Sequence, residues 1–267
     1  MLAAALSCAS AAWAANDLAL SGGIEQGGLV RGVAPPGTKI ALDGKPVRVA
    51  ADGHFVFGFG RDAPDRAQLV ATYPDGSTTE RDLAVAKRSY DVQSIKGLPE
   101  EMVTPDAATL DRIKRETALV GAARAKSADL PFFEEPLMWP VTGTITGIYG
   151  SQRILNGSPR APHLGVDVAA PAGTPVKASA GGTVVLAEGD LYFTGGTVII
   201  DHGYGLNTVY VHLRKLAVKL GQSVRQGEEI GELGMTGRAT GPNLHWGLNW
   251  YGVALDPERA AGPMPKE

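Results

Sequence analysis

Closely spaced turn signals restrict this 267-residue chain to a fold built from many short strands. Asp-Gly separates alternating apolar runs three times in the first third of the chain, at 43–44, 52–53 and 75–76. Asp-Gly between alternating apolar runs is a strong hairpin signal, because both central residues of the hairpin turn need positive φ. With 35 glycines, 18 prolines and only 6% aromatic residues, the sequence predicts a mainly β protein with tight turns.

Changes in local pattern divide the chain into successive segments. A small β-sandwich is predicted over 15–88, which contain the three hairpin signals. About 70 residues is near the lower limit for an independently stable core, so this domain is expected to lean on its neighbour. A helical linker is predicted over 89–136, a second β domain over 137–260, and a tail over 261–267.

One helix is predicted in the linker, from 105 to about 126. Thr104 is the expected N-cap, Pro105 suits the first helical position, and Asp106 favours the positive end of the helix dipole. Apolar residues recur at helical spacing after this point. The helix is expected to be a spacer that packs against one or both β domains.

Glycine interrupts short apolar segments throughout the second domain, and no helix is expected in it. These segments predict an antiparallel β structure. The predicted strands are 141–149, 166–169, 176–178, 183–186, 197–201, 208–212, 229–233 and 244–250.

The first fifteen residues are small and apolar and end in a pattern that fits signal-peptidase cleavage before Ala15. A signal peptide over 1–14 is therefore expected, with export to the periplasm or the cell envelope. No lysine or arginine precedes the apolar run, which leaves a buried helix as an alternative. A lipoprotein signal at Cys8 is disfavoured, because only seven residues precede this cysteine.

Cysteine content and charge exclude several kinds of site and partner. Cys8 is the only cysteine, so a processed chain would have no disulfide, cysteine nucleophile or thiolate ligand. Beyond the N-terminal segment, no stretch approaches the roughly 18 apolar residues that cross a bilayer, so no membrane span is expected. A net charge of −3 and a pI near 6.0 argue against binding nucleic acid or an anionic membrane.

Three residues of the second domain have the identities of zinc ligands: His163 and Asp167 in HLGVD, and His245 in NLHW. If both segments are strands, His163 and Asp167 share one face and Leu164 lies on the opposite one. His245 shares a face with Asn243 by the same alternation. Two imidazoles and one carboxylate is the ligand count of a catalytic zinc site, which keeps a fourth position open for water.

The other histidines have different surroundings in the sequence. His54 follows a turn, without an acidic or histidine companion at metal spacing, and is expected to face solvent. His202 is expected in a turn between two strands, where a structural role is favoured over a functional one. His212 shares a face with Tyr210 amid apolar neighbours, so it is a candidate for a site residue or for an isolated core histidine.

The stretch 162–257 resembles the lysostaphin/LytM-type zinc endopeptidases of bacterial cell walls, peptidase family M23. That family carries a His-x-x-x-Asp motif, a Tyr-x-His-Leu strand and a His-x-His motif, and this chain has corresponding segments in the same order. The resemblance implies one Zn²⁺ ion per chain, held by His163, Asp167 and His245. It also implies that His212 lies beside the metal as a general acid/base or a transition-state stabiliser.

The same resemblance implies a function. A zinc-dependent metalloendopeptidase that hydrolyses peptide bonds in peptidoglycan stem peptides or cross-links is expected, with peptidoglycan as its substrate. A regulatory protein is a candidate partner.

Asn243 departs from the family pattern, because the first position of His-x-His is an asparagine here. Asparagine donates or accepts hydrogen bonds but cannot accept and return a proton near neutral pH. In one interpretation His212 transfers the proton alone and Asn243 orients substrate or donates to the oxyanion, at a rate reduced on the order of 10²- to 10⁴-fold. In the other, the domain is a zinc-holding but silent module that binds cell wall or regulates a partner hydrolase.

A carrier domain is a remote alternative. The segments 176–184 and 224–231 are similar to half-repeats of biotinyl/lipoyl carriers, which implies a related barrel-sandwich architecture for the second domain. The sequence has no exposed hairpin tip with the lysine that such a carrier modifies, and this alternative leaves the histidines without a role.

Further polar and aromatic residues are candidates for a substrate groove. Arg153 is expected either to pair with a substrate carboxylate or to form a structural ion pair. Trp246 is better explained as core, because it faces away from His245. The aromatic candidates are Tyr192, Phe193, Tyr204, Trp246 and Trp250.

Overall fold

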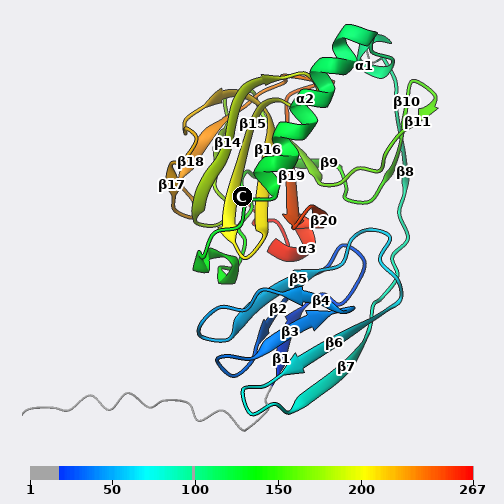
Figure 1. Cartoon of the computed structure of the whole chain (residues 1–267). Helices are drawn as coiled ribbons and strands as arrows, with labels where there is room; N and C mark the ends of the chain where they lie inside the picture. Colours follow the sequence, from blue (N-terminus) through cyan, green and yellow to red (C-terminus); the bar gives the residue numbers. More distant parts are fainter. Residues whose placement is uncertain (1–17, 98–99, 267) are drawn as a thin grey trace, which may run out of the picture.

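The computed structural model describes residues 18–97 and 100–266, so the expected signal peptide and Cys8 lie outside the described residues. The chain is mainly β, with antiparallel sheets and one long helix, which confirms the predicted fold class (Figure 1).

The N-terminal strands form two sheets around one apolar core. One sheet has the order β1-β2-β5 and the other β4-β3-β6-β7. Phe55 and Phe57 lie two residues apart on β5 and are fully buried in this core. Asp43 and Gly44 both have positive φ and join β3 to β4, as the first hairpin signal predicts. The strands are β1 (Ala19–Gly22), β2 (Leu29–Val33), β3 (Lys39–Leu42), β4 (Lys45–Val47), β5 (His54–Gly58), β6 (Arg66–Thr72) and β7 (Thr78–Ala84).

The linker contains helix α2 (Ala107–Arg124), which begins later than predicted. The N-cap is Asp106 and not Thr104, because the Asp106 carboxylate accepts a hydrogen bond from the amide of Thr109 at 2.8 Å. Pro105 therefore lies outside the helix. The other linker elements are β8 (Val92–Ile95), α1 (Glu100–Val103) and the 3₁₀ helix η1 (Pro131–Glu134).

The linker packs on the C-terminal domain along its length. Strand β8, which the sequence did not predict, pairs in parallel with β10 (Gln152–Leu155). Helix α2 lies across the face of the large sheet, where Val120 and Ala123 contact buried residues of that face such as Leu186 and Ile199 (Figure 1). The spacer is thus fixed to the second domain by both a strand pair and an apolar helix face.

A ten-stranded antiparallel sheet forms the C-terminal domain, with the path β17-β14-β15-β16-β19-β12-β9 and with β13, β18 and β20 attached to it. Trp246 is fully buried and lies 5.2 Å from Trp139 between ring centroids, which confirms its expected core position. The predicted strand over 141–149 is shorter than expected, whereas the central strands are longer. The remaining strands are β9 (Thr144–Gly147), β11 (Ser158–Pro159), β12 (Val166–Ala169), β13 (Pro175–Lys177), β14 (Gly182–Leu191), β15 (Gly195–Gly203), β16 (Leu206–Leu216), β17 (Ser223–Val224), β18 (Glu229–Leu233), β19 (Asn243–Trp250) and β20 (Val253–Leu255).

A short helix, α3 (Pro257–Ala261), contradicts the expectation of no helix in this domain. The residue that caps this helix also contacts the N-terminal domain. Asp256 caps α3 by accepting hydrogen bonds from the amides of Glu258 and Arg259, and Pro257 occupies the first turn. The same carboxylate pairs with Arg88 at 2.8 Å while only 3% exposed. Asp256 therefore stabilises both the helix and the contact between the two β domains.

We predict that Asp256→Ala lowers the free energy of unfolding by about 3–5 kcal/mol, because it leaves a largely buried Arg88 without its carboxylate. Asp256→Asn keeps a capping oxygen and should cost about 1 kcal/mol less than the alanine variant. Urea denaturation of the three proteins measures both differences. Equal stability of the two variants would contradict the capping role.

Candidate metal centre

The register of one strand pair brings the predicted ligands together. Strands β12 and β19 pair antiparallel, with Asp167 directly opposite His245 although they are 78 positions apart in the chain. His163 precedes β12 and is held by two backbone hydrogen bonds, from its amide to Ser151 O and from the Gly150 amide to its carbonyl. The strand begins only at Val166, as predicted, so the alternation does not extend to His163, and Leu164 is 42% exposed.

Three ligand atoms converge at one point. His163 Nε2 and His245 Nδ1 are each close to Asp167 Oδ1, at 3.0 and 2.8 Å, and the two nitrogens are 2.8 Å apart. The other ring nitrogen of His163, Nδ1, contacts the carbonyl of Ile148 at 3.1 Å, which leaves Nε2 directed at the carboxylate. Two ring nitrogens and one carboxylate oxygen are the donors of a catalytic zinc site, so the three residues fit a zinc ion.

Burial and mutual hydrogen bonds set the protonation states of these candidate ligands. Burial opposes ionisation of Asp167, but hydrogen bonds with His163 and His245 outweigh it and hold the pKa of Asp167 well below its ordinary value. Burial lowers the pKa of His245 despite the neighbouring carboxylate. The carboxylate is therefore ionised and the His245 imidazole favours its neutral form, which are the states that bind a metal.

Arg153 contacts the ligand Asp167. Its Nη2 donates to Asp167 Oδ2 at 2.6 Å, opposite the oxygen that faces the histidines. Arg153 was expected either to pair with a substrate carboxylate or to form a structural ion pair, and the structure shows an ion pair within the protein. The contact fixes the carboxylate orientation and leaves Oδ1 for the histidine cluster.

His212 lies on β16 beside the cluster and lines a small hollow with Asp167 and Asn243. Its Nδ1 is 2.8 Å from the carbonyl of Thr236, so Nδ1 carries the proton and Nε2 has a free lone pair. Burial, and then the charge of His245, lower the pKa of His212 to about 4. Its φ of 67° is unusual for a residue other than glycine, and such backbone strain gathers at functional sites.

Asn243 lines the same hollow, and its two amide atoms have different surroundings. Its Nδ2 donates to Gly241 O at 3.0 Å, which sets the orientation of the amide. Its Oδ1 is buried and has no hydrogen-bond partner among residues 18–97 and 100–266. A buried acceptor without a partner is costly, so it favours a ligand that donates a hydrogen bond here.

Two glycines that sequence reasoning missed give the ligands room. A Cβ at Gly165 would lie 2.6 Å from His245 Cε1 and from the Trp246 carbonyl. A Cβ at Gly147 would lie 2.6 Å from Asp167 Oδ2. The period-two pattern of HLGVD places Gly165 between the first two ligands, which is the signal that could have identified it.

The groove beside the ligands has one wall from the linker, which was also not predicted. Val103, Pro105, Leu110 and Ile113 line this groove of about 450 Å³ together with His163, His245 and other residues. Of the aromatic candidates, Phe193 alone is among the described residues that line it. Tyr204 and Trp250 instead pack in the apolar cluster near η1 and β20.

The two remaining histidines lie outside the cluster. His202 is the penultimate residue of β15, not a turn residue, and is fully buried with Nδ1 2.7 Å from Gly181 O and Nε2 2.8 Å from Thr208 Oγ1. His54 has acidic neighbours that the sequence did not indicate, Asp52 at 3.1 Å and Glu134 at 3.7 Å. Both sets of contacts are accounted for by structural roles.

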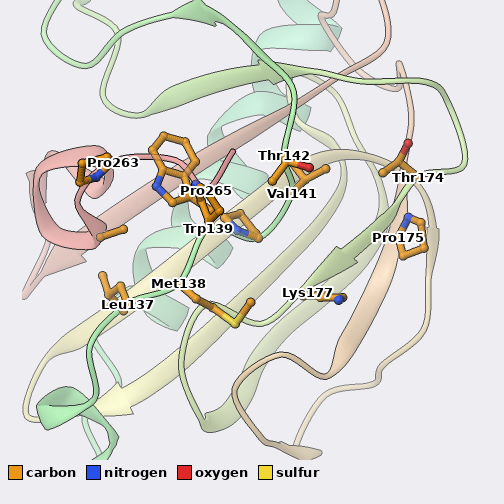
Figure 2. Close-up of a pocket in the computed structure, with 12 residues that line it drawn as sticks. Leu137, Met138, Trp139, Val141, Thr142, Thr174, Pro175, Lys177, Pro263 and Pro265 are labelled. Carbon is orange, nitrogen blue, oxygen red and sulfur yellow. The ribbon is translucent and has the colours of Figure 1, made fainter. Parts of the chain in front are cut away.

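A larger hollow of about 540 Å³ lies between residues 137–142 and the C-terminal prolines, with Lys177 at its edge (Figure 2). Trp139 lies beside Pro263 and Pro265, and Thr174 and Pro175 lie on the other side (Figure 2). None of the candidate catalytic or metal-binding residues lines this hollow. The chemistry therefore belongs to the groove beside His163 and His245.

Comparison with known proteins supports this location. Residues 161–257 match the family model of peptidase family M23. A solved M23 peptidase structure from Pseudomonas aeruginosa is 31% identical, with a TM-score of 0.67, and the match covers 90% of this chain and 96% of that one. The chain belongs to peptidase family M23.

Two curated relatives match part of the chain. Peptidoglycan DD-endopeptidase ShyA of Vibrio cholerae is 46% identical over 104 residues, and DD-carboxypeptidase/endopeptidase Mpg of Neisseria meningitidis is 44% identical over 104 residues. Each match covers 39% of this chain and 24% of the relative. The chain thus spans about a quarter of the length of these relatives. Within the part of the chain that the structure describes, no helix is long and apolar enough to span a membrane.

We predict that Gly165→Ala lowers zinc affinity about 10- to 100-fold, because the added methyl group displaces His245. Competition with a chelator measures the affinity. Gly189→Ala is the matched control, since a Cβ there meets nothing within 4 Å. An unchanged affinity in Gly165→Ala would contradict the need for space at this ligand.

Burial lowers the pKa of His202 to about 4, so the free energy of unfolding should depend on pH. The unfolded chain binds a proton below its own pKa near 6.5, so the free energy of unfolding should fall as the pH drops from about 6.5 to 4. The contribution of His202 is roughly 3 kcal/mol over this window. Urea denaturation from pH 7 to 4 should show a shallower fall in His202→Asn, and equal slopes would rule out this contribution.

Proposed function

We propose that the protein is a zinc-dependent endopeptidase that hydrolyses peptide bonds in peptidoglycan stem peptides or cross-links. The convergence of His163 Nε2, Asp167 Oδ1 and His245 Nδ1 within 3.0 Å carries this proposal. Family membership and the names of the relatives ShyA and Mpg support it. Such a substrate places the protein outside the cytoplasm, in the periplasm or the cell envelope.

His212 performs the proton transfer in this proposal. His163, Asp167 and His245 would hold one Zn²⁺ ion, which would supply a Lewis acid for the scissile carbonyl and for water. His212 accepts a proton at Nε2, because Thr236 O holds the proton of Nδ1 in place. A pKa of about 4 keeps the imidazole neutral at neutral pH, so it is ready to accept a proton and returns it readily to the leaving amine.

Asn243 positions the substrate as a hydrogen-bond acceptor. The contact with Gly241 occupies Nδ2, which leaves the buried Oδ1 as the acceptor without a partner among the described residues, in a side chain that lines the hollow with His212. An N–H group of a bound peptide would satisfy this oxygen. The role differs from the oxyanion donor suggested by the residue type alone.

A silent zinc-holding module is the second candidate, and Asn243 is the observation that favours it. The position aligns with a histidine of the family motif, and an asparagine there removes one group able to carry a proton. Such a module would bind cell wall or regulate a partner hydrolase. Membership of a peptidase family removes the support for the remote carrier alternative.

Zinc content and muropeptide release from purified peptidoglycan test the proposal with the full chain. We expect one zinc per chain and measurable release. His245→Ala should lose both, whereas His212→Ala should keep zinc and lose activity about 10²- to 10⁴-fold. Asn243→His should keep zinc and raise the rate, because it restores a second group that can carry a proton.

Two results would overturn the active-enzyme proposal. Stoichiometric zinc without release by the parent chain, together with release by Asn243→His, would establish the silent module. Absence of zinc under non-chelating conditions would contradict both candidates.

A further inference from the structure

The apolar stripe of helix α2 has different surroundings at its two ends. Leu110, Ile113 and Val120 recur at helical spacing, so they share one face of the helix. Val120 packs on buried residues of the large sheet. Leu110 and Ile113 belong to none of the apolar core clusters of the described residues, and they line the groove beside the metal ligands instead. The first half of the stripe therefore contributes to the groove and not to the core.

Polar contacts hold this half of α2 against the C-terminal domain. Arg112 Nη2 donates to the carbonyl of Asp190 at 2.6 Å, and Arg112 Nε donates to Glu116 Oε1 at 2.6 Å. The other carboxylate oxygen of Glu116 accepts a hydrogen bond from the amide of Tyr192 at 2.7 Å. The helix is thus fixed to the end of β14 before any ligand binds. A preformed wall loses little conformational entropy on binding, which favours affinity.

Exposed apolar side chains lie both on this wall and beside the ligands. Leu110 is 44% exposed, and Leu164, which follows the ligand His163, is 42% exposed. A single exposed leucine is common on protein surfaces, but apolar side chains that gather around a concave groove mark a ligand site. The groove has a volume of about 450 Å³, which is enough for a short peptide.

The position of the groove indicates its occupant. The ligands His163 and His245 line the same groove as the helix wall. A peptide whose carbonyl group lies at these ligands therefore occupies the groove and lies against Leu110 and Ile113. An apolar side chain of that peptide would be removed from water by the wall, whereas a glycine would leave the wall exposed.

We propose that helix α2 is part of the substrate-binding site, where Leu110 and Ile113 select peptides with an apolar side chain next to the bond that is cut. This inference rests on the proposed function and adds a determinant of specificity from the linker. Helix α2 lies outside residues 161–257, which match the family model. The first half of the helix binds substrate, and the second half fixes the helix to the sheet.

Titration of the full chain with two uncharged peptides, followed by NMR, tests the wall. N-acetyl-D-alanyl-D-alaninamide differs from N-acetylglycylglycinamide by two methyl groups. We expect the alanine peptide to bind more tightly, by about fourfold for each methyl group that the wall buries. The preference should be the same with and without added zinc, because the wall and not the metal contacts the side chain. Equal affinity of the parent chain for the two peptides would overturn the proposal.

Alanine variants of α2 locate the preference on the helix. Leu110→Ala and Ile113→Ala should each roughly halve the preference for the alanine peptide, because each removes part of the apolar wall while alanine maintains the helix. Leu119→Ala is the matched control and should keep the full preference, since Leu119 is 42% exposed on the same helix but lies outside the groove. An unchanged preference in the Leu110→Ala/Ile113→Ala double variant would overturn the proposal. An equal loss in Leu119→Ala would assign the effect to helix stability and would overturn it as well.

The peptide titration and the muropeptide assay fail independently. A chain that releases no muropeptide but prefers the alanine peptide through Leu110 and Ile113 refutes the proposed hydrolase and supports the binding wall. A chain that releases muropeptides but binds the two peptides equally supports the hydrolase and refutes the wall.

Discussion

The antiparallel pairing of β12 with β19 is the constraint on which the metal centre depends. It sets Asp167 opposite His245, and a shift of one residue would turn either side chain to the other face of the sheet. The core-facing partners of these residues hold that register, because Val166 and Trp246 are fully buried. The apolar core thus specifies the site by fixing the register of polar residues that lie outside it.

The linker forms one wall of the groove beside His163 and His245. The parallel pair of β8 and β10 and the packing of α2 on the sheet place Leu110 and Ile113 opposite His163. Asp256 then ties the N-terminal strands to the same body through Arg88. A segment that resembles a spacer in the sequence is therefore part of the binding surface.

The hairpins and the candidate ligands could be proposed from the sequence because their signals are local or depend on residue identity. Asp43-Gly44 specifies its own turn, and His163, Asp167 and His245 have the chemistry of zinc ligands. The failures arose where another interaction decides. Asp106 and not Thr104 caps α2 because its carboxylate reaches the Thr109 amide. His163 lies before β12 and is positioned by backbone hydrogen bonds to Gly150 and Ser151 instead of by strand alternation.

The sequence by itself determined which residues can hold a metal and that asparagine replaces a proton-carrying group at position 243. Only the tertiary structure decided how they act, because hydrogen bonds to distant backbone atoms orient the rings and amides. Thr236 O leaves Nε2 of His212 as the acceptor, Gly241 O makes Asn243 an acceptor, and Arg153 orients Asp167.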